Sequence, residues 1–333
     1  MRRILGDAFG ALASLRVAAY RRGFLTRARL AGPVVSVGNL GLGGSGKTPV
    51  VARVAEILRD AGEPVAVLSR GYGGRFRGEA LVVSDGTAVL AGAAEAGDEP
   101  VMLARALPGV VVAVGPRRDA VGRVVEARFG RCVHILDDGF QHLRLERDLD
   151  LVCLDVRDLD DRPMPAGRLR ERPAALGRAD FVLLTRTEAA SEEELSALEA
   201  HLGPERCFRV GRRVAGWSVL GGDTAAPPSR AFLLAAIARP ERLERDVAGC
   251  GVDVVGRAFF RDHHRFRADD LASVAERARA AGAEAIVTTA KDAVRLEGVP
   301  ALGLPVMVIS ISAEVADEAR LRARLLSAVG RAA

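Results

Sequence analysis

Eight consecutive residues near the start of the chain have the types and spacing of a loop that wraps phosphate groups. The segment Gly41–Thr48 is G-L-G-G-S-G-K-T and fits G-x-x-x-x-G-K-[ST] at every fixed position. Glycines let successive backbone N–H groups turn towards phosphate oxygens, and a following helix N-terminus adds partial positive charge. The residues predicted to contact a bound nucleotide are Gly41, Gly43, Gly44, Ser45, Gly46, Lys47 and Thr48.

Two side chains of this loop have predicted chemical roles. In loops of this kind the lysine, here Lys47, reaches the β- and γ-phosphates, and the hydroxyl of the last residue, here Thr48, coordinates Mg²⁺. Lys47 and Lys291 are the only two lysines among 48 Lys and Arg residues. In a chain that uses arginine almost everywhere, each lysine indicates a position that needs a compact ammonium group. The role of Lys291 stays open.

A pair of adjacent acidic residues follows a second apolar run. Asp137 and Asp138 come directly after residues 133–136, which have the composition of a buried strand. Two neighbouring carboxylates at the end of such a strand cannot both be buried without a partner, so a bound cation is the simplest explanation. The sequence therefore predicts a Mg²⁺ site formed by Thr48, Asp137 and Asp138.

Other polar segments allow two interpretations on their residues alone. Asp98 precedes a helical stretch and is explained best as its N-cap. The loop with Arg70 and Tyr72 follows a predicted strand and is either a grip for an acceptor molecule or a solvated turn. Asp262 with His263 and its neighbouring histidine resembles a metal site, but no third ligand is evident, and an acid–base role is the alternative. The pair Arg170 and Glu171 forms a further polar loop.

Short apolar runs alternate with amphipathic stretches of helical length from residue 33 onward. The predicted strands are 34–37, 65–68, 110–114, 133–136, 151–154 and 181–184, and the predicted helices are 49–61, 100–107 and 118–129. Continuous apolar strands separated by helices indicate α/β structure, with a parallel sheet covered by helices on both faces. Together with the phosphate loop, this pattern predicts a P-loop NTPase-like core.

A second, smaller alternation follows a helix predicted at 192–202 and a Gly- and Pro-rich linker at 210–228. Its predicted strands are 232–237, 253–258, 285–288 and 306–309, and its predicted helices are 241–248, 269–281 and 316–329. The predicted organisation is an N-terminal amphipathic helix in residues 1–30, a P-loop core domain in 31–212, and a smaller α/β domain with its linker in 213–333.

The positive charge of the chain is concentrated at its N-terminus. Residues 1–30 contain seven arginines and one aspartate, a net charge of +6, whereas the whole chain has +5. A nearly neutral body and few aromatic residues argue against nucleic acid as a partner. The four cysteines have no C-x-x-C spacing, so a zinc or disulfide framework is not predicted.

The longest uncharged run of the N-terminal stretch is residues 8–15. This run is far shorter than the roughly 20 apolar residues that a helix needs to span a bilayer. On a helical wheel Leu5, Phe9 and Leu12 share one face, and the opposite face is polar. An arginine-flanked helix of this kind binds an anionic membrane surface, with each basic residue contributing about 1 kcal/mol. The alternative is a helix packed on its own domain.

Taken together, the segments resemble one family, the tetraacyldisaccharide 4′-kinases of lipid A biosynthesis. The resemblance covers essentially the whole chain, with two differences in the second domain, Ala290 in place of Glu and Ala236 in place of Gly. The matching segments, in the family's order, are 37–49, 69–73, 97–100, 137–142, 262–263 and 291–292.

The resemblance implies an ATP- and Mg²⁺-dependent kinase that phosphorylates the 4′-hydroxyl of an acylated glucosamine disaccharide 1-phosphate. It places the protein at the cytoplasmic face of the inner membrane as a peripheral protein, with no obligate protein partner inferred. By similarity, Asp98 accepts the hydroxyl proton, His263 supports Asp98 from the second domain, and Gln141 helps to organise metal and phosphates. Arg70, Tyr72, Arg170 and Glu171 are assigned to the acceptor.

A membrane-associated P-loop ATPase switch is the alternative function. Such switches use an additional lysine near the start of the phosphate loop, where this chain has Leu42. They hydrolyse ATP on self-association or with a protein partner, whereas a kinase needs its acylated sugar acceptor for turnover.

Overall fold

The computed structural model describes residues 1–43, 46–296, 298 and 302–330. The chain forms two compact units, one made of Met1–Arg212 and Ala313–Ala333 and the other of Arg213–Ser312. The strands β8 (Cys207–Val219) and β12 (Val306–Val315) each contain a boundary between the units. The segment predicted as a linker, 210–228, therefore contains all but the first three residues of a continuous strand.

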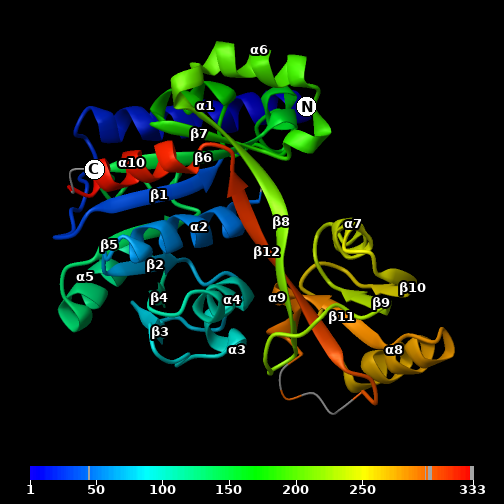
Figure 1. Ribbon diagram of the computed structural model, residues 1–333. Helices are drawn as coiled ribbons and strands as arrows, with labels where there is room; N and C mark the ends of the chain where they lie inside the picture. The colour runs from blue at the N-terminus through cyan, green and yellow to red at the C-terminus, as the bar shows by residue number, and fades with distance from the viewer. Residues whose placement is uncertain (44–45, 297, 299–301, 331–333) are drawn as a thin grey trace. The chain divides into compact units, whose positions relative to one another are not determined.

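The first unit contains a predominantly parallel sheet with the strand order β8-β7-β6-β1-β5-β2-β4-β3 (Figure 1). Only β3, at the edge, pairs antiparallel among the strand pairs with described register in this unit. The bounds of the remaining strands are β1 (Val34–Asn39), β2 (Val65–Ser69), β3 (Leu81–Asp85), β4 (Val111–Val114), β5 (Val133–Asp137), β6 (Leu149–Asp155) and β7 (Phe181–Thr185).

Both faces of this sheet are buried because helices cover each of them. Val34 and Leu68 pack in one cluster with Val121 of α5 (Arg118–Phe129). Val35, the next residue along β1, points to the opposite face and is also fully buried. Helix α2 (Lys47–Asp60) contacts β1, β2 and β5. The predicted α/β architecture with helices on both faces is confirmed.

The remaining helices of the first unit include the last one in the chain. Helix α10 (Glu318–Ala328) returns to the first unit and lies beside α2 (Figure 1). Glu318 accepts hydrogen bonds from Arg53 of α2. The sequence pattern had assigned residues from 313 on to the second domain, since a helix that follows a strand gives no sign of which sheet it covers. The other helices are α1 (Arg2–Arg21), α3 (Ala93–Ala96), α4 (Asp98–Ala106) and α6 (Glu192–Leu202).

The second unit contains the part of the 12-stranded sheet with the order β10-β9-β11-β12-β8. The pairs β10·β9, β9·β11 and β11·β12 are parallel, so the carboxyl ends of these strands lie at one edge. Its elements are β9 (Arg230–Ala235), α7 (Glu241–Gly249), β10 (Asp253–Phe259), α8 (Ala268–Ala280), β11 (Ala285–Thr289) and α9 (Ala290–Ala293).

Candidate active site

The phosphate loop lies between β1 and α2, as the sequence predicts. Gly46 is the N-cap of α2 and has φ +79°, a left-handed conformation that glycine adopts without strain. On the other side of the loop, Leu42 N donates to the Arg168 carbonyl (2.8 Å) and Arg170 N donates to the Leu40 carbonyl (2.7 Å). The loop is thereby joined to the segment with Arg170. The predicted phosphate ligands Gly44 and Ser45 lie outside the described residues.

Lys47, the first residue of α2, is held by two acceptors from neighbouring strands. Its Nζ donates to Asn39 Oδ1 (2.8 Å) and to a carboxylate oxygen of Asp138. Asn39 also donates from Nδ2 to the Gly41 carbonyl (2.8 Å). The buried amide of Asn39 therefore fixes both the lysine and the start of the loop, a role that the sequence analysis did not assign to it. The only sequence signal was its place at the end of a buried strand, next to the glycine-rich segment.

Arg170 and Gln141 complete this network. Arg170 NH1 donates to Asp138 Oδ2 (2.7 Å) and to Gln141 Oε1 (3.2 Å), and Gln141 Nε2 donates to the Asn39 carbonyl (3.0 Å). The contacts of Arg170 place it beside Lys47 at the phosphate loop, and its predicted contact with the acceptor stays a prediction. Two cations therefore flank one carboxylate where phosphate oxygens are expected.

The two acidic residues at the end of β5 have different electrostatic environments. Burial is the main cause that raises the pKa of Asp137 to about 6, and the neighbouring charge of Glu99 adds to it. Ser69 Oγ donates to Asp137 Oδ2 (2.8 Å). Burial also disfavours ionisation of Asp138, but the charges and hydrogen bonds of Lys47 and Arg170 outweigh it and lower the pKa of Asp138. Asp138 is ionised and paired, whereas Asp137 is a buried carboxyl that a cation would stabilise in its ionised form.

These residues fit a Mg²⁺ ion that is bound mainly through nucleotide phosphates. The donor set is all oxygen, from the carboxylates of Asp137 and Asp138 and the hydroxyl of Thr48, and oxygen ligands suit Mg²⁺. Within the described residues there is no group of three or more His, Cys, Asp or Glu arranged to hold a metal ion. An ion here would therefore take its remaining ligands from phosphate and water, as is usual for Mg²⁺ in kinases.

The segment with Arg70 and Tyr72 packs against the start of α4. Gly97 has φ +92°, and a Cβ atom at this position would lie 2.4 Å from the Tyr72 carbonyl oxygen, so the close approach requires glycine. Asp98 follows directly as the first residue of α4. The side chain of Tyr72 is 76% exposed. The backbone of the predicted acceptor loop is thus packed against Gly97, the residue before the predicted base.

Glu171, a predicted site residue, and Arg118, which the sequence analysis did not single out, are both buried in the first unit. Glu171 is buried, and both of its carboxylate oxygens accept hydrogen bonds from Arg178 (2.8 and 3.0 Å), which also lies over the ring of Phe140 (4.3 Å). Its predicted contact with the acceptor stays a prediction. Arg118 was overlooked; burial lowers the pKa of its guanidinium, and the charges of Asp137 and Asp138 oppose this shift. It adds a third cation to the surroundings of the acidic pair.

In the second unit, His263 follows β10 and has φ +62°, an uncommon conformation for a residue other than glycine. Its Nε2 lies 3.3 Å from Lys291 Nζ. The ring of His264 is elsewhere, stacked on Phe260 and bonded through Nε2 to Asp270 (2.8 Å). The two histidines therefore do not converge on one ion, and His264 has a packing role.

Helix α1 packs on the first unit through glycine and exposes its large apolar side chains. Gly6 and Gly10 are buried against the segment with Pro163. Exposed apolar residues on this helix and just after it are Ile4, Leu5, Phe9, Leu12, Leu15, Phe24 and Leu25. The helix is thus attached to its own domain, yet the predicted apolar face is not used for that packing. No helix in the described part of the chain is long and apolar enough to cross a membrane.

The fold and the phosphate-loop network define a P-loop protein of the phosphotransferase type. A family model described as tetraacyldisaccharide-1-P 4′-kinase matches residues 2–330, and the chain belongs to this family. It is 45% identical to a tetraacyldisaccharide 4′-kinase of Anaeromyxobacter sp. (strain Fw109-5), over 97% of this chain and 90% of the relative. A Geobacter metallireducens relative of the same name is 42% identical, over 88% and 87% of the two chains.

A solved structure supports the same assignment. The crystal structure of LpxK from Aquifex aeolicus in complex with ATP is similar to this chain with a TM-score of 0.79 and 29% identity, covering 98% of this chain and 97% of the other. The resemblance found in the sequence is confirmed, and so is the P-loop fold class.

Proposed function

We propose that this chain transfers the γ-phosphate of ATP to the 4′-hydroxyl of tetraacyldisaccharide 1-phosphate, the lipid acceptor of its family. The observation that supports this most directly is the pairing of Lys47 with Asp138 beside Arg170, at the loop where a triphosphate fits. Membership of the kinase family and the ATP complex of the Aquifex aeolicus relative support the donor and the reaction.

The chain's own residues act by positioning and charge neutralisation, which is what phosphoryl transfer needs most. On nucleotide binding, Lys47 and Arg170 would exchange Asp138 for phosphate oxygens, and the bond to Asn39 keeps the lysine at the loop. Bound Mg²⁺ supplies charge neutralisation between the β- and γ-phosphates. Asp137, Asp138 and Thr48 would hold that ion.

Asp98 is proposed as the general base that accepts the proton of the 4′-hydroxyl. It lies at the N-terminus of α4, and the side chain of Tyr72 in the adjoining loop is exposed. Arg70 and Tyr72 are proposed to bind the acceptor. His263 of the second unit is proposed to support Asp98 in this step, as the family resemblance implies.

The direct test is transfer of label from γ-labelled ATP to an extracted tetraacyldisaccharide 1-phosphate. We expect label in the lipid and little ATP hydrolysis when the acceptor is omitted. ATP hydrolysis that is independent of the acceptor but rises with protein concentration would instead favour the ATPase switch.

Association with the cytoplasmic face of the inner membrane is the second part of the proposal. The support is the row of exposed apolar residues on α1 together with the net charge of +6 in residues 1–30. Such a helix lies in the headgroup layer of an anionic bilayer. Deleting residues 1–25 should reduce partitioning into vesicles that contain anionic lipid and leave ATP binding unchanged; equal partitioning of both proteins would refute this part.

A further inference from the structure

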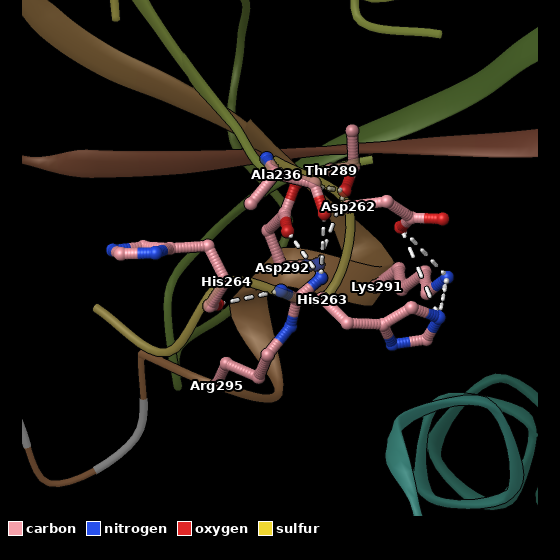
Figure 2. Close-up of polar contacts among 8 residues, drawn as sticks. All are labelled: Ala236, Asp262, His263, His264, Thr289, Lys291, Asp292 and Arg295. Atoms are coloured by element: carbon pink, nitrogen blue, oxygen red, sulfur yellow. Dashed lines mark hydrogen bonds and ion pairs between the residues drawn. The ribbon is translucent and has the colours of Figure 1, made fainter. Parts of the chain in front are cut away.

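Three polar segments of the second unit meet at the carboxyl edge of its parallel strands. Ala236 follows β9, the segment Asp262–His264 follows β10, and Lys291 and Asp292 lie in α9 directly after β11 (Figure 2). Because β10, β9 and β11 are neighbours and parallel, residues that follow them lie side by side. The ring of His264 is held by Asp270, and among the residues that the structure describes no three His, Cys, Asp or Glu are grouped to hold a metal ion.

The peptide groups of Ala236 are the centre of the cluster. The Ala236 carbonyl accepts a hydrogen bond from the backbone N–H of His263 (3.2 Å) and another from Arg295 NH2 (3.0 Å). The Ala236 N–H donates to Asp292 Oδ2 (3.1 Å). The carbonyl that accepts from the backbone of His263 is therefore itself bound by Arg295, and the N–H of the same residue is bound by Asp292.

Asp292 and Arg295 form a buried pair whose remaining hydrogen bonds also serve this loop. Arg295 NH2 donates to Asp292 Oδ1 (2.6 Å), and Arg295 NH1 donates to the His264 carbonyl (2.8 Å). Asp292 Oδ2 also accepts from Thr289 Oγ1 (2.9 Å). The side chain of Asp292 is fully buried and that of Arg295 is 6% exposed. Burial raises the pKa of Asp292, and the charge of Arg295 counteracts this most strongly.

These bonds hold the backbone of His263, whose imidazole is more exposed than the side chains of Asp292 and Arg295. His263 is held in its left-handed conformation while its ring, 37% exposed, points to Lys291, away from the ring of His264 (Figure 2). A left-handed conformation at a residue other than glycine or asparagine costs free energy and persists when surrounding contacts determine it. Here the bonds from Asp292 and Arg295 to Ala236 and His264 provide those contacts.

We propose that Asp292 and Arg295 are positioning residues for His263, holding the Ala236 peptide and the His264 carbonyl so that the imidazole keeps its working orientation. This inference rests on the proposed role of His263 in phosphotransfer. It assigns a function to the Lys291–Asp292 segment, in which the aspartate acts through the loop and does not touch substrate.

The test is the conservative variant Arg295→Lys in the full-length protein, with kcat and KM measured for ATP and for the lipid acceptor. Lysine keeps a positive charge beside Asp292, so the fold is retained, but one ammonium cannot reproduce the planar fork that joins Asp292, Ala236 and His264. We expect kcat to fall roughly tenfold to 10²-fold, as for a small displacement of a reacting group, with KM for ATP unchanged. Asp292→Asn should behave similarly, because one amide cannot accept at both of its terminal atoms.

Two controls separate positioning from a merely structural role. Arg257→Met removes an exposed ion pair with Glu244 in the same unit and should leave kcat unchanged. In a His263→Ala background, Arg295→Lys should cause no further loss of kcat. With ¹⁵N-labelled histidine, Arg295→Lys should shift the ring resonances of His263 and leave those of His134 unchanged.

The possible failures are distinguishable. Wild-type kcat in Arg295→Lys, or an equal loss in both backgrounds, would overturn the positioning role while leaving the kinase proposal intact. Wild-type kcat in His263→Ala would contradict the proposed role of His263 and this inference with it. Absence of any lipid phosphorylation by the wild-type protein would refute the proposed function itself.

Discussion

The polar clusters at the sheet edges of the two units are held in different ways. At the phosphate loop, side chains bind side chains, and Asp138 is shared between Lys47 and Arg170. In the second unit the side chains of Asp292 and Arg295 bind backbone groups that hold His263. The first arrangement consists of charges that can change partner when a phosphate arrives. The second fixes a conformation before any ligand binds, so each cluster should respond differently to substitution.

The largest effect is expected from replacing Lys47, whose ammonium group can exchange Asp138 for a phosphate oxygen. Lys47→Ala deletes the ammonium that neutralises the β- and γ-phosphates, and we expect kcat/KM for lipid phosphorylation to fall roughly 10³-fold. Nucleotide affinity should fall as well, which titration with a fluorescent ATP analogue would measure. Unaltered ATP affinity would mean that the network around Asp138 is not the phosphate site.

Asp98→Asn should affect the chemical step alone. The amide keeps the size and N-terminal position of the side chain on α4 but cannot accept the hydroxyl proton, so kcat should fall about 10²-fold. Because the proposed role of Asp98 is at the hydroxyl of the acceptor, the Kd for ATP should stay within twofold of the wild-type value. Glu99→Gln is the matched neighbour: it removes a charge that acts on Asp137 and should alter Mg²⁺ dependence instead.

The raised pKa of Asp137 predicts a dependence of Mg²⁺–nucleotide binding on pH. The carboxyl keeps its proton up to about pH 6 in the folded protein, against an ordinary value of 3.8, so without metal the free energy of unfolding decreases as pH rises from 4 to 6. Metal binding requires the ionised form, and affinity should weaken up to roughly tenfold per pH unit below 6 and level off above it. Calorimetry in two buffers of different ionisation enthalpy would measure the released proton, and a pH-independent affinity in Asp137→Asn is the control.

The smallest effect is expected at His264, the neighbour of His263. His264→Gln loses the stack on Phe260 and the bond to Asp270, so the melting temperature should fall by a few degrees. Because the backbone carbonyl of residue 264 still accepts from Arg295, kcat should change less than threefold. A large loss of kcat with an unchanged melting temperature would contradict the assignment of a packing role to His264 and of the role in phosphotransfer to His263 alone.

The sequence predicted the elements of the site whose chemistry is local. The glycine spacing, Lys47 and Thr48 specify a phosphate loop wherever a strand precedes them and a helix follows. Asp137 and Asp138 at the end of an apolar run likewise predicted an acidic strand end. The exposed apolar face of α1 was visible as periodicity, but its packing through Gly6 and Gly10 was not, because small residues give no periodic apolar signal.

What only the tertiary structure decided is which distant residues share a hydrogen bond. Asn39 with Lys47, Arg170 with Asp138, and Arg295 with Ala236 join different segments of the chain. The same order of strands along the chain permits several orders within a sheet, and strand order determines which strand ends become neighbours. Local residue types therefore determined what chemistry this protein can perform, whereas the packing of strands determined which side chains act together.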